Sequence, residues 1–295
     1  MALAMNRSIT AITVTHNSAH TVRGALARLP PGVEIVCVDN ASTDDLSTAL
    51  SGLAVHRIDN PVNLGFGRAC NIGAAAATGE YLLFINPDVR LGTDAVDALM
   101  QAAERYPNCG VFVPRTNTVD GRLWFREESE IDRLSGVSLP TRIRQVWGDC
   151  CVRFVNGGVF MIKRTLFLDT GGFDEDIFLY FEDDDLSYRL LQRDEPMILV
   201  SGAHAVHDIG TSVAQSTRSR IFRYRSKMRS EIHLRKKYGI AYSPFVDILR
   251  YSTKIGFYCL TLNRNRLINS LGRLIGIFDS ILDRSRANRN RGYVA

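Results

Sequence analysis

The chain has 295 residues, of which 45% are hydrophobic and 9% aromatic. This is enough to bury a sizeable core and excludes a chain that is disordered throughout. The net charge of +5 is unevenly distributed: residues 216–295 contain 18 Lys and Arg against 4 Asp and Glu, or +14, and residues 1–215 contain the remaining 18 against 27, or −9. We therefore expect an N-terminal domain, residues 1–215, and a basic C-terminal extension, residues 216–295, that favours polyanions.

The six cysteines show no CxxC spacing, and several lie in apolar, strand-like runs. This usage is typical of buried thiols in a reducing compartment and not of a disulfide framework. Residues 1–6 do not form a basic region followed by an apolar stretch, so we expect no secretion signal. The longest apolar stretch of the C-terminal third, residues 255–262, is far shorter than the roughly 20 residues that cross a bilayer. The sequence predicts a cytoplasmic protein.

The first third of the chain alternates short β-branched runs with helical patterns. Residues 9–15 are predicted as a strand, residues 19–29 as a helix and residues 33–38 as a second strand. This order is typical of a parallel sheet. The alternation continues with a helix at about 43–53, an edge strand at 55–58, a helix at 67–77 and a buried strand at 81–85.

The rest of the chain is less regular. Residues 115–150 are predicted as irregular, residues 152–162 as a strand carrying the Gly157-Gly158 break, and the pattern beyond Ser216 is helical. We predict an α/β fold with a mostly parallel sheet flanked by helices, followed by a C-terminal helical extension. Polar residues then fall at the carboxyl ends of strands, where open α/β sheets bind ligands.

Two polar clusters lie in this first third. The run from Asp39 to Asp44 follows the second strand, where a carboxylate can accept the imide N–H of a uracil or thymine ring. Helix capping by Ser42 is the commoner meaning of such a run taken alone. The second cluster places two glycines, Gly65 and Gly67, at a helix start, which suits a diphosphate held by backbone N–H groups. It is not a dinucleotide fingerprint, because the third glycine is missing.

Asn86-Pro87-Asp88 ends the apolar run of residues 81–85. Its carboxylate can hold Mg²⁺ or Mn²⁺, hard cations that prefer oxygen ligands and bridge substrate phosphates; the alternative is a Pro-Asp turn. His204 and His207 suggest zinc, but neither a cysteine nor a third histidine lies at suitable spacing, so zinc is not expected.

The densest acidic cluster is Glu182-Asp183-Asp184-Asp185. Acids favour the first turn of a helix, and Asp185 can pair with Arg189 at i,i+4. The apolar flanks of the cluster also indicate that part of it faces a cleft, where crowding raises carboxylate pKa values towards those of a useful general base.

These motifs occur in one ordered set: Val14-Thr15-His16-Asn17-Ser18, Val38-Asp39-Asn40-Ala41-Ser42-Thr43-Asp44, Asn63-Leu64-Gly65-Phe66-Gly67, Asn86-Pro87-Asp88, Gly171-Gly172-Phe173-Asp174, Glu182-Asp183-x-Asp185, and His207 with Gly210-Thr211-Ser212. The set resembles that of the inverting family 2 glycosyltransferases and looks most like their bacterial rhamnosyltransferase branch. The resemblance covers roughly residues 8–240. Each motif alone is weak, but the order is specific. The resemblance implies a GT-A fold.

The resemblance also implies roles for individual residues. Asp183 would deprotonate the acceptor hydroxyl, supported by Glu182 and Asp185, and Asp88 and His207 would bind Mg²⁺ or Mn²⁺. The donor-binding residues would be Thr15, Asn17, Asp39, Asn40, Gly65, Arg68 and Asn86. Asn86 departs from the family pattern, since it replaces the first carboxylate of the usual Asp-x-Asp motif, and this would make the metal affinity modest.

The implied reaction is single displacement with inversion on a nucleotide diphosphate sugar. The rhamnosyl branch implies L-rhamnose from dTDP-L-rhamnose, passed to a hydroxyl of a glycan, polyprenyl-diphosphate-linked, in cell-surface polysaccharide synthesis. Two alternatives stay open. A nucleotidyltransferase would need a glycine loop rich in Lys and Arg near the N-terminus, and none is visible. A non-catalytic glycan or lipid-carrier binding module would be expected to have lost Asp88 or the acidic cluster, and both are present.

The C-terminal extension carries an apolar stripe at helical spacing, formed by Leu267, Leu271, Leu274, Ile275, Phe278, Ile281 and Leu282, with arginines before, within and after it. Such a helix can lie in the interface of an anionic membrane, or its stripe can pack on the catalytic domain. The resemblance favours a peripheral position at the inner face of the cell membrane. Nucleic acid is not expected, because no aromatic platform or recognition motif accompanies the positive charge. The sequence does not indicate an oligomeric state.

Overall fold

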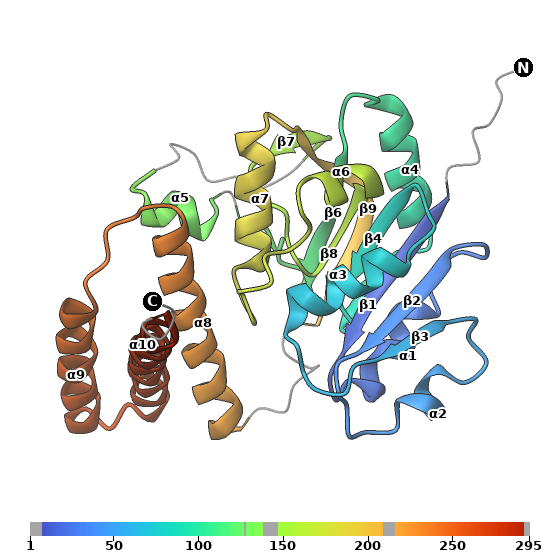
Figure 1. Ribbon diagram of the computed structural model, residues 1–295. Coiled ribbons are helices and arrows are strands. Elements are labelled where there is room, and N and C mark those ends of the chain that lie inside the picture. The colour runs from blue at the N-terminus through green and yellow to red at the C-terminus, as the bar shows by residue number, and fades with distance from the viewer. Residues whose placement is uncertain (1–7, 127, 138–146, 209–215, 292–295) are drawn as a thin grey trace, which may run out of the picture. The chain divides into compact units, whose positions relative to one another are not determined.

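The computed structural model describes residues 8–126, 128–137, 147–208 and 216–291, with side chains described up to Asp283. The chain divides into two compact units, whose elements are labelled in Figure 1. The first, the α/β unit, contains Met1–Glu175 and Glu182–Val213; the second, the helical unit, contains Asp176–Phe181 and Ala214–Ala295. The boundary predicted after residue 215 and the motif at residues 210–212 lie outside the described residues.

One nine-stranded sheet forms the centre of the α/β unit, in the order β3-β2-β1-β4-β8-β6-β9-β5, with β7 paired to β9. The strands are β1 (Ile9–Thr15), β2 (Glu34–Asp39), β3 (His56–Asp59), β4 (Tyr81–Ile85), β5 (Val89–Leu91), β6 (Val111–Thr118), β7 (Cys150–Val152), β8 (Val159–Lys163) and β9 (Met197–His207). Pairing is parallel from β3 through β4 and between β6 and β9. The other pairs are antiparallel.

The predicted α/β fold is confirmed, and the sheet contains both parallel and antiparallel pairs. The βαβ pattern of the first third gives the parallel strands, since each is reached through a crossover helix. β8 instead runs back beside β4, with Ile85 opposite Val159, and so separates the two parallel sets.

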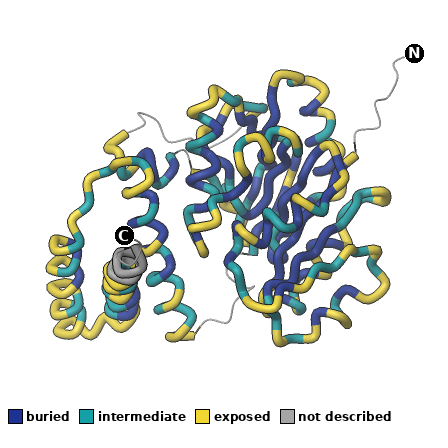
Figure 2. The backbone as a smooth tube through the Cα atoms, in the orientation of Figure 1, coloured by how far each residue is buried: buried dark blue, intermediate teal, exposed yellow. Residues whose placement is uncertain are grey.

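Helices contribute to the buried clusters on both faces of this sheet. The helices of this unit are α1 (Ala19–Leu26), α2 (Leu46–Leu50), α3 (Phe66–Ala76), α4 (Ala95–Arg105), α5 (Glu130–Leu134), α6 (Arg164–Asp169) and α7 (Glu182–Gln192). Side chains of β4 alternate between the two clusters: Leu82 and Phe84 pack with α3, α6 and α7, whereas Leu83 packs with α4. Since both faces are covered, β4 is apolar along its whole length, and Figure 2 shows it dark blue.

The helical unit consists of α8 (Thr217–Lys237), α9 (Pro244–Leu260) and α10 (Arg264–Arg291), which confirms the predicted helical extension. Its core contains Met228, Ile232, Tyr251 and Ile277. α10 approaches α8 closely at Gly276, where an added Cβ would lie 2.6 Å from the carbonyl oxygen of Arg225. No helix among the described residues is long and apolar enough to span a membrane.

The predicted apolar stripe lies within α10, and the structure divides it. Leu267, Leu271 and Leu274 are half-buried, so the first part of the stripe packs in the helical unit. Phe278 and Leu282 in its last part are exposed.

Candidate active site

The carboxyl ends of β1 and β2 bring Thr15 and Asp39 opposite each other in the parallel register. The Thr15 hydroxyl donates a hydrogen bond of 3.3 Å to Asp39 Oδ1, and the N–H of Ser42 donates to the same oxygen at 3.2 Å. The guanidinium of Arg57, in the neighbouring strand β3, lies 3.2 Å from Asp39 Oδ2. These three donors surround a buried carboxylate at a strand end. Arg57 was not predicted, because nothing in its own neighbourhood distinguishes it from a surface cation.

Asn40 uses its side chain to shape the loop before α3. Its Nδ2 donates to Asn63 Oδ1 at 2.9 Å and to the carbonyl of Gly65 at 3.0 Å. Its Oδ1 accepts from Asn60 Nδ2 at 3.2 Å and from the N–H of Leu64 at 2.9 Å. With both donors and both acceptor positions used, this amide positions the loop.

Asn17 joins the loops that follow β1 and β2. Its Oδ1 accepts from the N–H of Thr43 at 2.7 Å, and its own N–H donates to Ser42 Oγ at 2.9 Å. The backbone of Asn17 is left-handed, with φ of 57°, a conformation that asparagine tolerates better than most residues. The two loops are therefore fixed to each other at the edge of the sheet.

Gly65 and Arg68 lie at the start of α3. Gly65 is the N-cap residue, with φ of 91°, and makes no side-chain cap, so the first N–H groups of α3 remain suited to an anion. Arg68 Nε lies 3.1 Å from Glu175 Oε2, and both side chains are largely exposed.

The Gly171-Gly172-Phe173-Asp174 motif docks onto α3. Asn71 exchanges two hydrogen bonds with the backbone of Phe173, at 2.9 and 2.8 Å. A Cβ on Gly172 would lie 2.6 Å from Asn71 Oδ1, and a Cβ on Gly67 would lie 2.9 Å from Phe173 Cβ. These glycines are required for close packing between two segments about a hundred residues apart in the chain.

Asp88 and His207 meet where β5 pairs with β9. Val89 lies opposite His207, and the N–H of Asp208 donates to the carbonyl of Asp88 at 3.0 Å. Both side chains are buried, and His207 Nε2 lies 3.2 Å from Asp88 Oδ1. The ring of Trp124 packs edge-on against the imidazole, with centroids 4.1 Å apart. Trp124 falls in the segment that was predicted as irregular.

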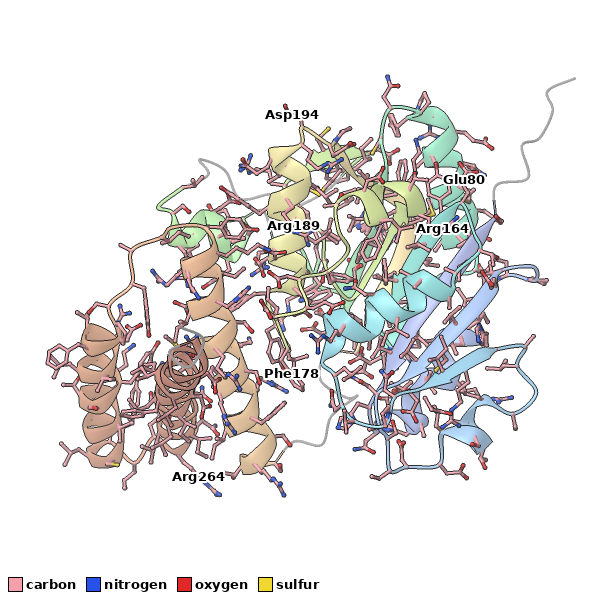
Figure 3. The ribbon with its side chains drawn as sticks, in the orientation of Figure 1. Glu80, Arg164, Phe178, Arg189, Asp194 and Arg264 are labelled. Carbon is pink, nitrogen blue, oxygen red and sulfur yellow. The ribbon has the colours of Figure 1, made fainter. Side chains whose placement is uncertain are left out.

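The four acids at the start of α7 have different surroundings. Asp185 is buried and lies 2.8 Å from Arg189 Nε, as the i,i+4 alternative predicted. Arg189 also donates at 2.6 Å to the carbonyls of Thr170 and Gly172, and Figure 3 labels it on α7. Asp185 therefore holds the glycine turn in place through Arg189, so its carboxylate has a structural role.

Asp184 and Glu182 are also buried. Arg126 Nη2 donates to both oxygens of Asp184, at 2.8 and 2.9 Å, and the N–H of Glu130 donates to Oδ1 as well. Burial, and then the charge of Asp183, raise the pKa of Asp184 to about 7, while Arg126 acts in the opposite direction. Burial raises the pKa of Glu182 well above its usual range, and its Oε2 has no hydrogen-bond partner among the described residues. Arg126 was not predicted.

Asp183 differs from the other three acids because it is only half-buried. Its Oδ2 accepts a hydrogen bond of 3.2 Å from the N–H of Gly157, and its Oδ1 accepts from the N–H of Asp184 at 3.0 Å. The chain enters α7 through Tyr180 and Phe181, two successive non-glycine residues with φ of 68° and 71°. Such strained backbone clusters at functional sites.

Two successive glycines join this carboxylate to the Asp88–His207 pair. A Cβ on Gly157 would lie 3.0 Å from Asp183 Oδ2, and a Cβ on Gly158 would lie 3.0 Å from His207 Nδ1. The N–H of Asn86 donates to the carbonyl of Gly158 at 2.8 Å. The Gly157-Gly158 pair therefore brings the acidic cluster and the Asn86-Pro87-Asp88 motif to one place.

The residues around Asp88 fit a divalent cation. Two ligands held side by side on Mg²⁺ at about 2.1 Å lie about 3 Å from each other, and Asp88 Oδ1 lies 3.2 Å from His207 Nε2. Asn86 Oδ1 is buried and lacks a hydrogen-bond partner among the described residues. A buried polar atom is costly when unpaired, so its presence here favours a polar ligand at this site.

Comparisons with known proteins identify the family and the fold of the chain. The family model described as Glycosyl transferase family 2 matches residues 10–171, more than half of the chain. One relative is the N-acetylglucosaminyl-diphospho-decaprenol L-rhamnosyltransferase of Mycobacterium tuberculosis, which is 28% identical over 246 residues, covering 71% of this chain and 79% of that protein.

Two solved structures share the fold. The mannosyltransferase PcManGT from Pyrobaculum calidifontis, in complex with GDP-Man and Mn²⁺, has a TM-score of 0.56 and 16% identity, covering 95% of this chain and 88% of that one. GalNAc-T7 with UDP, GalNAc and Mn²⁺ has a TM-score of 0.59 and 16% identity, covering 79% of this chain and 48% of that one. The resemblance predicted from the motifs is confirmed: the chain belongs to glycosyl transferase family 2, has the GT-A fold and is similar to a bacterial rhamnosyltransferase.

Proposed function

We propose that this glycosyltransferase is an inverting, metal-dependent enzyme that transfers L-rhamnose from dTDP-L-rhamnose to a hydroxyl of a polyprenyl-diphosphate-linked glycan, in cell-surface polysaccharide synthesis. The observation that carries the proposal is the Gly157-Gly158 pair, which has the Asp183 carboxylate beside one glycine and the His207 ring beside the other. The name of the Mycobacterium tuberculosis relative supports the sugar and the lipid-linked acceptor.

In this proposal Asp183 is the general base. It is the half-buried acid of its cluster, and the N–H groups of Gly157 and Asp184 orient its oxygens. Its carboxylate accepts the proton of the acceptor hydroxyl as the acceptor oxygen bonds to the anomeric carbon and the bond to the diphosphate oxygen breaks. Displacement from the opposite side inverts the anomeric configuration. Burial raises the pKa values of Glu182 and Asp184, so near neutral pH these two neighbours place less negative charge around the Asp183 carboxylate.

The metal ligands in this proposal are Asp88 and His207, with Asn86 beside them. A bound Mg²⁺ or Mn²⁺ would neutralise the charge that develops on the leaving diphosphate. Trp124 and the backbone at Gly158 hold the His207 ring in place, so that Nε2 stays directed at Asp88.

The donor residues in this proposal divide into contact and positioning residues. Thr15 and Asp39 border the nucleobase, and the N-terminus of α3 at Gly65, with Arg68, receives the diphosphate. Asn17 and Asn40 position these loops through the hydrogen bonds described above.

The same proposal makes residues 1–215 the nucleotide-sugar-binding and catalytic domain. Residues 216–295 become a basic extension that holds the enzyme at the inner face of the cell membrane, where a lipid-linked acceptor lies. The charge balance of +14 in that extension supports this position.

A donor screen with purified protein tests the function. Release of nucleotide diphosphate is followed across dTDP-, UDP- and GDP-linked sugars with a soluble acceptor analogue, and the anomeric configuration of the product is read by NMR. We expect dTDP-L-rhamnose to be preferred and its configuration to be inverted. A retained configuration would remove the single-displacement mechanism, and preference for another donor would remove the rhamnosyl assignment alone.

Exhaustive treatment with EDTA tests the metal. We expect activity to disappear and to return on addition of Mg²⁺ or Mn²⁺, because Asp88 and His207 lie at the spacing of two ligands. Full activity in EDTA would overturn the metal role of both residues.

A further inference from the structure

α9 packs in the helical unit through one side only. Asp247 and Tyr251 are its buried residues, and Ile248, Ile255 and Tyr258 are half-buried. Tyr251 joins the core formed with Met228, Ile232 and Ile277 on the other two helices. The remaining surface of α9 is therefore not needed to hold the helical unit together.

That remaining surface carries several large apolar side chains. Those that are exposed, which we call the outer face, are Phe245, Val246, Leu249, Phe257 and Leu260, together with Leu262 in the following turn. At about 100° per residue, Phe245, Leu249 and Leu260 fall within about 60° of the helix circumference. Leu260 is 86% exposed and Leu262 89% exposed. Figure 2 shows α9 yellow along much of its length. An apolar patch of this kind on a folded surface marks an interaction site.

The charges around the outer face are positive. The one acid of α9, Asp247, lies on the packed side and pairs with Arg250 at 3.4 Å. Arg250 and Lys254 are exposed and border the apolar residues. Arg264 and Arg266, at the start of α10, are exposed directly after Leu262. A face with an apolar centre and a cationic border complements an anionic bilayer, which offers acyl chains below its phosphates.

We propose that the outer face of α9 is the membrane-binding surface of this protein. The helix lies parallel to an anionic bilayer, with Phe245, Leu249, Phe257 and Leu260 at the boundary of headgroups and acyl chains and with Arg250 and Lys254 at the phosphates. The inference rests on the proposed function only in that a lipid-linked acceptor gives the contact a purpose. It replaces the stripe of α10 as the membrane surface, because the first part of that stripe packs inside the helical unit.

Co-sedimentation of the full chain with vesicles tests this surface. The vesicles are phosphatidylcholine alone or phosphatidylcholine with about a third of phosphatidylglycerol, each at low and high salt. The test variant is L249S/F257S/L260S, and the matched control is I275S/F278S/L282S on the exposed part of α10. All six positions are exposed, so neither variant removes a core contact.

We expect the full chain to bind the anionic vesicles in a salt-sensitive way. The α9 variant should bind at least about tenfold more weakly and the α10 control within about twofold of the unchanged chain, because only the former loses apolar area in the bilayer. Equal binding by both variants, or loss in the α10 control alone, overturns the proposal. The proposal is also overturned if the unchanged chain does not bind vesicles and the α9 variant differs from it in oligomeric state, measured by light scattering. The outer face would then contact a second copy of the chain.

Sugar transfer to the soluble acceptor analogue is measured on the same samples. This reaction needs no bilayer, so we expect the α9 variant to keep it. Vesicle binding without transfer to any acceptor would overturn the proposed function and support the membrane-binding surface. Transfer without vesicle binding would overturn the membrane-binding surface and support the proposed function.

Discussion

At the residue scale, the acidic cluster shows what a local pattern can and cannot reveal. Four successive acids before an apolar helix predict a helix start with an unusual density of charge. Three of the acids differ in the group that they contact: Asp184 contacts Arg126, Asp185 contacts Arg189 and Asp183 contacts the N–H of Gly157. Only the i,i+4 partner, Arg189, was within reach of sequence reasoning, and that prediction was confirmed.

The first residue-scale prediction concerns Asp183→Asn. The amide keeps the shape of the side chain but cannot accept the proton of the acceptor, so donor binding should persist while transfer falls by about a hundredfold or more. Isothermal titration with the nucleotide diphosphate and an initial-rate assay separate these two effects. Asp194→Asn, which changes an exposed acid in the turn after α7, is the control. A rate within about tenfold of the unchanged enzyme, or about 1.4 kcal/mol of barrier, would overturn the role of Asp183 as the base.

A second prediction concerns Gly158→Ala. The new methyl group would lie 2.9 Å from Trp124 and 3.0 Å from the His207 ring, so these two side chains must move to make room for it. Displacement of a catalytic group by about 1 Å can cost about a hundredfold in rate, and we expect a loss of that order with a higher Mg²⁺ requirement. Gly24→Ala, where an added Cβ meets open space, is the matched control and should be as active as the unchanged enzyme. Equal rates for both variants would contradict the geometry at His207.

A third prediction follows from the pKa of Asp184, which burial raises to about 7. The same group titrates near 4 in an unfolded chain, so between about pH 4 and 7 the folded protein binds more protons. Its contribution to stability is full below about pH 4 and is lost as the pH rises through about 7, to a limit of about 4 kcal/mol. Asp184→Asn lacks this titration. Urea unfolding from pH 4 to 8 should show the unchanged protein losing stability relative to the variant, and a difference independent of pH would mean that Arg126 keeps the carboxylate charged.

At the element scale, the regular parts of the fold were predictable. The strands predicted at residues 9–15 and 81–85 coincide with β1 and β4, because β-branched residues dominate the first run and large apolar residues the second. The helix predicted at 43–53 is confined to Leu46–Leu50. Its expected first turn is drawn into the loop after β2 by hydrogen bonds to Asp39 and Asn17.

Elements that depend on distant partners were not predictable in the same way. Residues 152–162 form the end of β7 and most of β8, which pair with different strands on either side of Gly157-Gly158. β6 extends to Thr118, inside the segment predicted as irregular, because β9 runs beside it with a register shift after Pro114. Such pairing is set by the whole sheet and leaves only a weak trace in the local sequence.

A fourth prediction tests the contact between α3 and the glycine turn. Asn71→Ala removes two hydrogen bonds and leaves the N–H and carbonyl of Phe173 unpaired. We expect a loss of about 2 kcal/mol in the free energy of unfolding, within the usual cost of unpaired buried groups, measured by urea denaturation. Gln101→Ala, an exposed residue of α4, should change stability by less than about 0.5 kcal/mol. If the two substitutions cost the same, the turn is held by Phe173 packing and not by the amide.

At the scale of the whole molecule, the chain has two kinds of interior. The clusters around the sheet are large and aromatic-rich, whereas the helical unit has a small core around Met228 and Ile277. The charge balance of −9 for residues 1–215 and +14 for residues 216–295 is the reason that composition predicted a boundary after residue 215. The segment Asp176–Phe181 groups with the helical unit, and no local pattern of composition indicated this.

The last prediction asks whether the catalytic domain we propose keeps its fold when the helical unit is weakened. Ile277 and Ile162 are both fully buried, one in each unit, so truncation to Ala should cost each core about 2 to 5 kcal/mol. If the two cores are separate, Ile277→Ala should lower the temperature at which the helix signal in circular dichroism is lost. Its affinity for the nucleotide diphosphate with Mn²⁺ should stay within about threefold of that of the unchanged protein. Ile162→Ala, in β8 beside β4, should weaken nucleotide binding and stability together. If Ile277→Ala lost nucleotide binding in step with its helix signal, the two units would unfold as one cooperative body, and the proposed division into a catalytic domain and an extension would have to be abandoned.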